Sequence, residues 1–239
     1  MKLPFLMNVT NEIEKMRADS FWTKEPETIE IIKDFSNHIM LARPYVFLDV
    51  GANVGIYSLY AASLYPDMII ISVEPETENY KALLENIKLN NFKNIIPLQV
   101  AIDGFNSIKI FSVDKKIKSG NSSGALNAHN VKKNNKKIIS MSIDAIKEIV
   151  HYVDFLKIDI DGGEFQAISG MMSTLEKKEI ITILIEISIE NLNKYTLAMD
   201  FIENNGYSAS NRFNSLYNHS SFRRAKENIN VTNVVFVRS

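Results

Sequence analysis

The stretch FLDVGANVGIYSLYAA, residues 47–62, joins a run of apolar residues to an acid and a turn that contains two glycines. The run YVFLDV at 45–50 indicates a buried strand, and the apolar spacing over 53–64 predicts a helix directly after it. Gly51 and Gly55 let the backbone turn tightly and let another group approach without a Cβ in the way. The stretch is therefore either an ordinary strand-to-helix turn or a turn that holds a nucleotide-like ligand.

The rest of the chain alternates between runs of β-branched residues and segments with helical spacing. Strands are predicted at 45–50, 68–74, 94–101, 153–160, 180–187 and 233–238, and helices at 53–64, 77–90, 164–176 and 192–204. Continuous apolar strands are typical of a parallel sheet that is buried on both faces. Helix-length crossovers between them imply right-handed βαβ units and a doubly wound α/β sheet. A final strand of this kind often runs antiparallel at or near a sheet edge.

Two regions depart from this alternation. Residues 8–42 carry helical spacing that stops at Arg43-Pro44, so we expect a short helical N-terminal extension at 1–44, ahead of one Rossmann-like domain at 45–239. Residues 114–137 are rich in Lys, Asn, Ser and Gly between two short strand-like runs, and they predict a mobile loop over the ligand face.

The composition narrows the class of protein. With 27 basic and 28 acidic residues in 239, the chain has no net field that favours nucleic acid or an anionic membrane. The absence of cysteine excludes disulfides, thiolate catalysis and thiolate zinc sites. No stretch approaches the roughly 18–20 apolar residues that span a bilayer, so we expect a cytoplasmic protein with no transmembrane segment. The oligomeric state is left open.

Three acids follow three of the predicted strands: Asp49, Glu74 and Asp159. Ligands of open parallel sheets gather beyond the carboxyl ends of the strands, so three acids in register suggest one pocket. The dinucleotide pattern G-x-G-x-x-G is not met, because Asn53 and Ile56 stand where glycines would be. A pyrophosphate-binding dehydrogenase is therefore disfavoured.

The segments FLDVGANVGIYS, VEPETENYKALLENIKLN, SIDAI and DFLKIDIDGGEFQAISG occur in this order and resemble the FkbM family of S-adenosylmethionine-dependent methyltransferases over about residues 45–190. The resemblance implies the class I methyltransferase fold, a Rossmann-like and mostly parallel seven-stranded sheet with helices on both faces. One departure is Asp161, where glutamate is more usual in the family.

The resemblance also implies a cofactor site for S-adenosylmethionine. Its amino-acid portion would lie among Asp49, Gly51, Asn53 and Gly55, Glu74 would accept from both ribose hydroxyls, and Asp103 would lie by the adenine. Each acid also has a plainer interpretation. Asp49 would cap a helix or shape a turn, Glu74 would face solvent, and Asp103 would form an Asp-Gly turn.

A hydroxyl acceptor must lose its proton, which calls for a general base or a cation. Asp159, Asp161 and Glu164 lie within six residues, and Asp159 and Asp161 would project to one side if the strand continued that far. Such oxygens would suit magnesium or calcium, but we favour metal-free transfer because Asp161 is short and Gly162-Gly163 is flexible. Otherwise these residues are a turn and a helix start.

The candidate catalytic residues are thus Asp159, Glu164 and His129, the last as a base in the predicted loop or as a surface histidine. Lys157 and Glu186, on neighbouring strands, would form a polar contact near the acceptor or a structural pair.

The favoured function is O-methyl transfer to a hydroxyl of a sugar, glycan or related small molecule. The alternative is a non-catalytic protein that binds an S-adenosyl ligand or serves in assembly. Nucleic-acid methylation lacks support, because no N-P-P-Y-type motif and no basic stripe is present.

Overall fold

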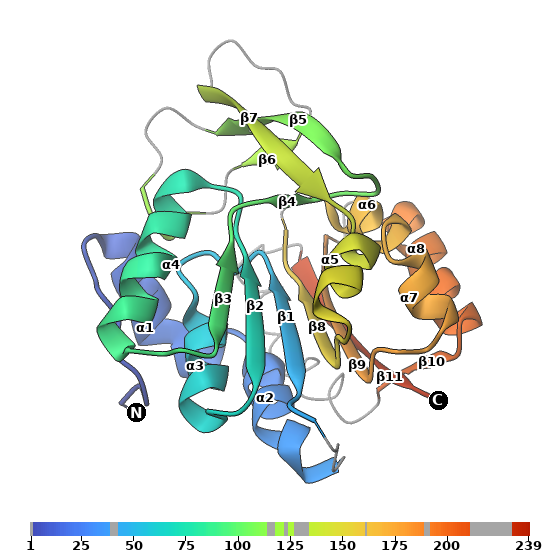
Figure 1. Cartoon of the computed structure of the whole chain (residues 1–239), viewed down its shortest axis with the longest axis horizontal. Coiled ribbons are helices and arrows are strands. Elements are labelled where there is room, and N and C mark those ends of the chain that lie inside the picture. The colour runs from blue at the N-terminus through green and yellow to red at the C-terminus, as the bar shows by residue number, and fades with distance from the viewer. Residues whose placement is uncertain are drawn as a thin grey trace.

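The computed structural model describes residues 2–38, 43–113, 118–121, 124–126, 134–160, 162–188, 192–210 and 231–239. Seven of the described strands form a central sheet in the order β10–β11–β9–β8–β1–β2–β3 (Figure 1). They are β1 (Val46–Val50), β2 (Ile69–Val73), β3 (Ile95–Leu98), β8 (Phe155–Ile158), β9 (Thr182–Ser188), β10 (Tyr207–Ala209) and β11 (Val231–Arg238). In this sheet only β11 runs antiparallel to its neighbours, so the predicted doubly wound, mostly parallel seven-stranded sheet is confirmed.

The strand order reverses between β1 and β8. β2 and β3 continue the sheet on one side of β1, and β8 and β9 continue it on the other. The register places Asp49 of β1 opposite Ser72 of β2 and opposite Lys157 of β8. Open α/β sheets bind ligands beyond the carboxyl ends of the strands at such a reversal. The candidate site is therefore expected around the end of β1.

Helices cover both faces of the sheet. They are α1 (Glu12–Lys24), α2 (Pro26–His38), α3 (Ile56–Leu64), α4 (Thr77–Asn90), α5 (Ile143–Val150), α6 (Glu164–Ser169), α7 (Met172–Glu176) and α8 (Leu192–Asn204). One core cluster joins the strands to α5, α6, α7 and α8, and a second joins them to α1, α2 and α3. None of the helices in the described ranges is long and apolar enough to cross a membrane.

Alternate residues of each strand supply the two clusters. Leu48 and Val50 of β1 belong to the first cluster and Phe47 belongs to the second. Phe47 stacks on Phe155 of β8 with ring centroids 4.6 Å apart. Burying each ring stabilises the fold by roughly 1.5–3 kcal/mol. The sequence signature of continuous apolar strands thus has its cause in helices that pack on both faces.

The N-terminal helices pack on the face that carries α3. Helix α1 begins at Glu12 because the Asn11 side chain accepts from the first backbone N–H groups of the helix. The ring of Phe21 meets that of Tyr60 edge-on, with centroids 5.1 Å apart. Phe21 lies in the same core cluster as Phe47 of β1. The division at residues 44 and 45 into an extension and a domain stays a prediction.

A second, four-stranded sheet lies beyond the carboxyl ends of β1, β2 and β3 (Figure 1). Its order is β4 (Ala101–Ile102), β7 (Asn134–Met141), β5 (Ser107–Val113) and β6 (Ala125–Leu126). The strand predicted at 94–101 is therefore divided, because β3 belongs to the central sheet and β4 to the second one. The two short strand-like runs pair with each other as β5 and β7, which are antiparallel.

The single helix that the sequence predicts at 164–176 is divided into two helices, α6 and α7. Gly170 ends α6 by donating its N–H to the carbonyls of Gln166 and Ala167, and α7 follows. A Cβ at Gly170 would lie 2.5 Å from the carbonyl oxygen of Asp103, so this close approach depends on glycine. Three further elements, α5, β6 and β10, were not expected from the sequence.

Candidate active site

The turn after β1 is fastened to the ends of both neighbouring strands. Gly51 and Ala52 donate their N–H groups to the carbonyl of Val73 at 2.9 and 3.0 Å. Gly51 has φ +86°, and a Cβ there would lie 1.8 Å from the carbonyl oxygen of Asp159. The backbone that approaches this glycine is thus the end of β8, so Gly51 brings the two halves of the sheet together.

The turn continues through two more left-handed residues into α3. Asn53 has φ +53° and Gly55 has φ +89°, which is why α3 begins at Ile56 rather than at 53. A Cβ at Gly55 would lie 2.4 Å from Cδ1 of Leu83 in α4. Gly55 is therefore required by contact between two helices as well as by its conformation.

Glu74 lies at the end of β2 and faces this turn. It is 5% exposed, and its carboxylate accepts the N–H groups of Asn53 and Glu76, each at 2.8 Å. Burial raises the pKa of Glu74 to about 7, against the opposing effect of these two hydrogen bonds. A carboxylate has about four lone-pair sites, so Glu74 retains capacity for further donors. Its ribose-binding role stays a prediction.

The raised pKa of Glu74 predicts that cofactor binding depends on pH. If Glu74 binds the ribose, the ribose hydroxyls would donate to its ionised form, so protonation should weaken binding as the pH falls below about 7. We expect affinity to fall up to tenfold per pH unit in this range, since one proton is displaced for each cofactor bound. Calorimetric titration between pH 5.5 and 8 measures this, and Glu74→Gln should abolish the dependence.

Glu76→Gln is the matched control for that titration. Its buried carboxylate caps α4 by accepting from the N–H groups of Glu78 and Asn79, a role that a glutamine oxygen can keep. The control should retain the dependence on pH. An affinity that is constant over the range in the unaltered protein would remove Glu74 from the cofactor site.

The side chain of Asp49 on β1 is 1% exposed, and only one of its two carboxylate oxygens has a hydrogen-bond partner among the described residues. Ser72 donates to the Ser58 hydroxyl at 2.7 Å, and Ser58 donates to Asp49 Oδ2 at 2.6 Å. Asp49 Oδ1 is buried and has no hydrogen-bond partner among the described residues. Burial raises the pKa of Asp49, while Lys157 and the Ser58 hydrogen bond lower it. An orphaned acceptor of this kind calls for a donor from a ligand.

Asp103 is held by its own surroundings. It follows β4, its Oδ1 accepts the N–H of Gly104 at 2.8 Å, and its carboxylate pairs with Lys109. The hydrogen bond to Gly104 accords with the Asp-Gly turn that was one of its two interpretations, and neither interpretation is tested. Contact with adenine stays a prediction.

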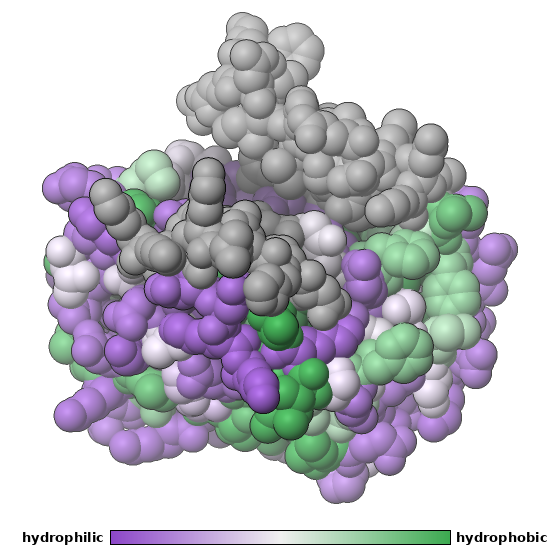
Figure 2. All heavy atoms as spheres, turned by 90° about the horizontal axis from the view of Figure 1, so that it is seen from above, coloured by the Kyte–Doolittle hydropathy of each residue, from purple (hydrophilic) through white to green (hydrophobic). Residues whose placement is uncertain are grey.

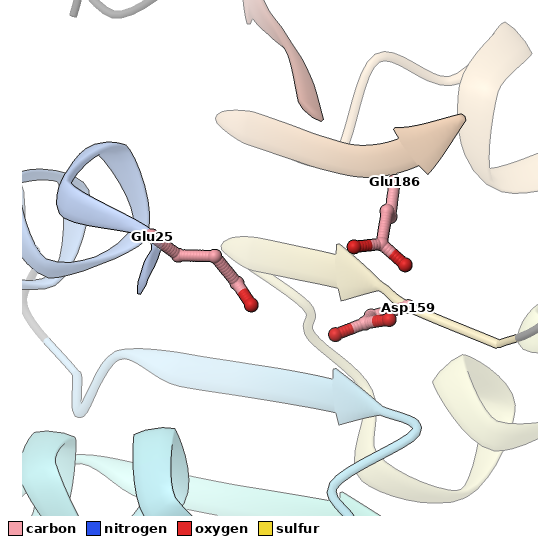
Figure 3. A group of neighbouring side chains, drawn as sticks. All are labelled: Glu25, Asp159 and Glu186. Atoms are coloured by element: carbon pink, nitrogen blue, oxygen red, sulfur yellow. The ribbon is translucent and has the colours of Figure 1, made fainter. Parts of the chain in front are cut away.

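Asp159 belongs to a group of three acids that is drawn from separate parts of the chain. Figure 3 shows Glu25 from the junction of α1 and α2, Asp159 from the end of β8 and Glu186 from β9, with carboxyl groups pointing toward one another. One oxygen of each lies within 4.8 Å of the others. We call Glu25, Asp159 and Glu186 the acid group.

Lys157 is the cation of this group. Its Nζ lies 2.6 Å from Asp159 Oδ2 and 3.9 Å from Glu25 Oε2, and its side chain is 1% exposed. Burial opposes the charge of Lys157, but Asp159, Glu25 and Asp49 raise its pKa well above the usual range. The ammonium already supplies the positive charge that these carboxylates require, which favours a site without a divalent metal.

The pKa values of the acid group diverge. Burial alone would raise all three, but Lys157 and Lys24 hold the pKa of Asp159 far below its usual range. Lys24 and Lys157 likewise lower that of Glu25. Glu186 is different, because burial and the nearby charges of Asp159 and Glu25 raise its pKa well above the ordinary value. The carboxyls of Asp159 and Glu186 point toward each other, and one oxygen of each lies within 4.8 Å of the other.

A polar row crosses the sheet beneath α1, α2 and α3. Each member of the row has, two positions away on its own strand, an apolar residue of the second core cluster, the one that includes α1, α2 and α3. The members are Ser72, Asp49, Lys157, Glu186 and Asn233. Side chains two apart point to one face, so the row faces the N-terminal helices. Glu27 of α2, 0% exposed, accepts from the Asn233 amide at 2.6 Å.

Of the other candidate catalytic residues, Glu164 is not a member of the acid group, and His129 lies outside the residues that the structure describes. Glu164 is 3% exposed at the start of α6, and its Oε1 accepts the N–H of Gly162 at 3.1 Å. Asp161 and His129 fall outside the described residues. Since β8 ends at Ile158, the strand alternation that would have aligned Asp159 with Asp161 does not extend that far.

Part of the predicted loop is fastened over the turn. Residues 118–121 are described, and the Asn121 carbonyl accepts from the side-chain amides of Asn53 at 3.1 Å and Asn79 at 2.9 Å. The N–H of Gly120 donates to Asn79 Oδ1 at 2.8 Å, and its carbonyl accepts from Arg17 of α1. We call residues 118–121 the strap.

Asn79→Ala should release the strap. The substitution removes hydrogen bonds to Gly120 and Asn121, each worth about 1 kcal/mol, so exchange at the Gly120 amide should accelerate about tenfold or more. Hydrogen exchange with and without S-adenosylmethionine measures this. Equally slow exchange of the strap in the variant and the unaltered protein would show that these bonds do not hold it.

The fold and this edge of the sheet define a class I methyltransferase. Residues 49–209 match the sequence profile described as the methyltransferase FkbM domain, so the chain belongs to the FkbM methyltransferase family. Methyltransferase sdnD of Sordaria araneosa is 34% identical over 94 residues, which cover 36% of this chain and 36% of that protein. The match thus spans little more than a third of the relative's length.

Two solved methyltransferase structures align with this chain at low sequence identity. The methyltransferase domain of METTL16 aligns with a TM-score of 0.50 and 11% identity over 98% of this chain and 74% of that one. The precorrin-6y C5,15-methyltransferase of Geobacter metallireducens aligns with a TM-score of 0.45 and 14% identity over 85% and 78%.

The methyltransferase fold implies a cofactor of the S-adenosylmethionine type. The orphaned Asp49 Oδ1 fits such a molecule, because its amino-acid portion carries an ammonium donor. The remaining capacity of Glu74 fits hydroxyl donors. Both acids lie beside the reversal of strand order, where the fold places ligands.

Proposed function

We propose that this protein uses S-adenosylmethionine to methylate a hydroxyl of a sugar, a glycan or a related small molecule. The observation that carries the proposal is the pair of carboxyl groups of Asp159 and Glu186 at the cofactor end of β8, with one oxygen of each within 4.8 Å of the other. A group that can take a proton is what a hydroxyl acceptor needs and what methylation of an already basic nitrogen does not.

The cofactor would be held by residues of the first two strand ends. Asp49 Oδ1 would accept from the ammonium group, and Glu74 would accept from the ribose hydroxyls. Gly51, Asn53 and Gly55 would hold the turn around the amino-acid portion, with Asp103 toward the adenine. When bound, S-adenosylmethionine supplies an electrophilic methyl group on a sulfonium.

This chain's own residues would orient the acceptor and move its proton. Asp159 would accept a hydrogen bond from the hydroxyl, and Lys157 would fix the direction of that carboxylate through the 2.6 Å contact. In-line displacement depends strongly on such positioning. Glu164 and His129 remain candidates for the acceptor side, and no divalent metal is proposed.

The kind of acceptor is proposed from charge. The net charge of −1 gives no support for a nucleic-acid backbone as partner, whereas a small polyhydroxy compound requires none. Figure 2, which looks down on the side that carries the second sheet, shows hydrophilic residues over much of the described surface. A cytoplasmic location is part of the same proposal and accords with the lack of cysteine.

Titration and a transfer screen test the proposal. S-adenosylmethionine should bind with a micromolar Kd, on the order of −8 kcal/mol. A screen of glycans and hydroxylated small molecules, with RNA as comparison, should then give methyl transfer to a hydroxyl compound only. Binding without transfer to any acceptor would favour the non-catalytic alternative, and transfer to RNA would overturn the acceptor class.

A further inference from the structure

The carboxyls of Asp159 and Glu186 lie too close together for both to be ionised without a large electrostatic penalty. One oxygen of each lies within 4.8 Å of the other and of the Glu25 carboxylate, and burial together with the charge of Asp159 raises the pKa of Glu186. Of two carboxyl groups that share one site, one keeps its proton to a much higher pH than the other. Lys157 contacts Asp159 directly, so the negative charge is most stable on Asp159 and the proton on Glu186.

We propose that Asp159 and Glu186 act as one proton-sharing pair that accepts the acceptor's proton, and that Glu25, from the N-terminal segment, sets the pH at which the pair is ready. The inference rests on the proposed O-methyl transfer. Asp159 and Glu186 would be the catalytic residues, and Glu25 and Lys157 the positioning residues.

The number of protons bound to the Asp159–Glu186 pair decides whether the pair can act as a base. With one bound proton, the pair carries one negative charge, which neutralises the charge of Lys157. A second bound proton would leave the Lys157 ammonium without its ionised partner at 2.6 Å. With no proton, the pair carries two negative charges and takes up a proton readily. The doubly ionised pair is therefore the base, and the rate should rise with pH as Glu186 ionises.

The transfer step balances on this basis. The acceptor oxygen forms its bond to the methyl carbon while the carbon–sulfur bond breaks and leaves its electron pair on sulfur. The hydroxyl proton moves to a carboxylate oxygen of the pair, which returns to the singly protonated state. Loss of that proton to solvent resets the pair.

The charged groups around Glu186 raise or lower its pKa. Glu25 disfavours its ionisation, and Lys24, 44% exposed beside Glu25, favours it. Lys157 lies on the neighbouring strand, and Asp49 lies beyond it in the same row. Burial and the charge of Glu25 raise the pKa of Tyr57 of α3, so its phenol stays neutral, and Asn233 of β11, opposite Glu186, is neutral as well. Asp49 Oδ1 is a second, independent sign of a ligand at this layer, since it is buried without a partner among the described residues.

Three glutamine variants of the full chain separate these roles. Glu186→Gln mimics the protonated carboxyl but cannot release a proton, so turnover should fall by about 10²–10⁴-fold. Glu25→Gln removes a like charge within 4.8 Å and should move the rising limb of the pH–rate profile down by on the order of one pH unit. Glu27→Gln is the matched control, because Glu27 is equally buried but bonds to Asn233, and its profile should be unchanged.

A titration of the carboxyl groups tests the pair without turnover. Glutamate labelled with ¹³C at the side-chain carboxyl should show, besides the signal of Glu74, a second signal that titrates well above the ordinary range. That signal should be absent in Glu186→Gln, shifted to lower pH in Glu25→Gln and unmoved in Glu27→Gln. An ordinary titration of Glu186, or full activity with an unchanged pH profile in Glu186→Gln, overturns the inference. Absence of transfer by the unaltered protein to every hydroxyl compound defeats the proposed function instead, and the titration alone then decides the pair.

Discussion

Gly51→Ala is expected to destabilise the protein and to abolish most cofactor binding. The methyl group would lie 1.8 Å from the Asp159 carbonyl oxygen, and alanine would have to adopt φ +86°. The left-handed conformation costs roughly 1–2 kcal/mol for a residue with a Cβ. Moving the backbone of β8 away adds about 1–3 kcal/mol. Urea unfolding and calorimetric titration with S-adenosylmethionine measure the two effects.

Gly162→Ala is a control that introduces the backbone strain of a left-handed alanine without a steric clash of its Cβ. Gly162 has φ +84°, but a Cβ there would meet nothing within 4 Å. This variant should lose only the roughly 1–2 kcal/mol of the left-handed conformation and should bind the cofactor normally. Equal losses in the two variants would show that the contact between the turn and the end of β8 has no special role.

Asp159→Asn is expected to lower turnover by about 10²–10⁴-fold, the effect of a lost general base, with little change in cofactor affinity. The amide keeps the shape of the side chain but cannot take up a proton, and it deprives Lys157 of its ionised partner at 2.6 Å. Initial rates at saturating cofactor, together with calorimetry, distinguish the two quantities.

Two comparisons accompany that variant. Glu164→Gln tests the neighbouring acid, whose oxygen accepts from Gly162, a bond that a glutamine oxygen can keep. A chelator should leave turnover unchanged, because Lys157 supplies the cation of the acid group. Full activity in both Asp159→Asn and Glu164→Gln would leave these acids with structural roles alone, and loss of activity with chelator would require a metal.

The sequence predicts the central sheet well because the strands are buried on both faces. Burial on both faces requires continuous apolar runs, as in Phe47 and Leu48 of β1, and such runs are visible without a structure. Short elements such as β10 and α5 are not, since β10 is only three residues long and is held by β11. The break at Gly170 depends on a contact with Asp103, far away in the sequence.

The candidate site was predictable only in part for the same reason. Acids at strand ends are found by counting along predicted strands, and this places Asp49, Glu74 and Asp159 at one edge. Sequence proximity, however, grouped Asp159 with Asp161 and Glu164, whereas folding brings Asp159 to Glu25 and Glu186. Glu25 lies between two helices and is buried, but no local pattern in the sequence distinguishes it from glutamates that lie on the surface.

The position of Glu25 has a consequence for comparisons within the family. The segment that matches the family profile begins at residue 49, so a residue of the acid group lies upstream of everything the profile scores. Two relatives can therefore agree at every matched position and still differ in the charge beside Lys157. Diversification of acceptor choice or working pH can proceed through exchange of the N-terminal helices, while the turn that would receive the methyl donor is inherited unchanged.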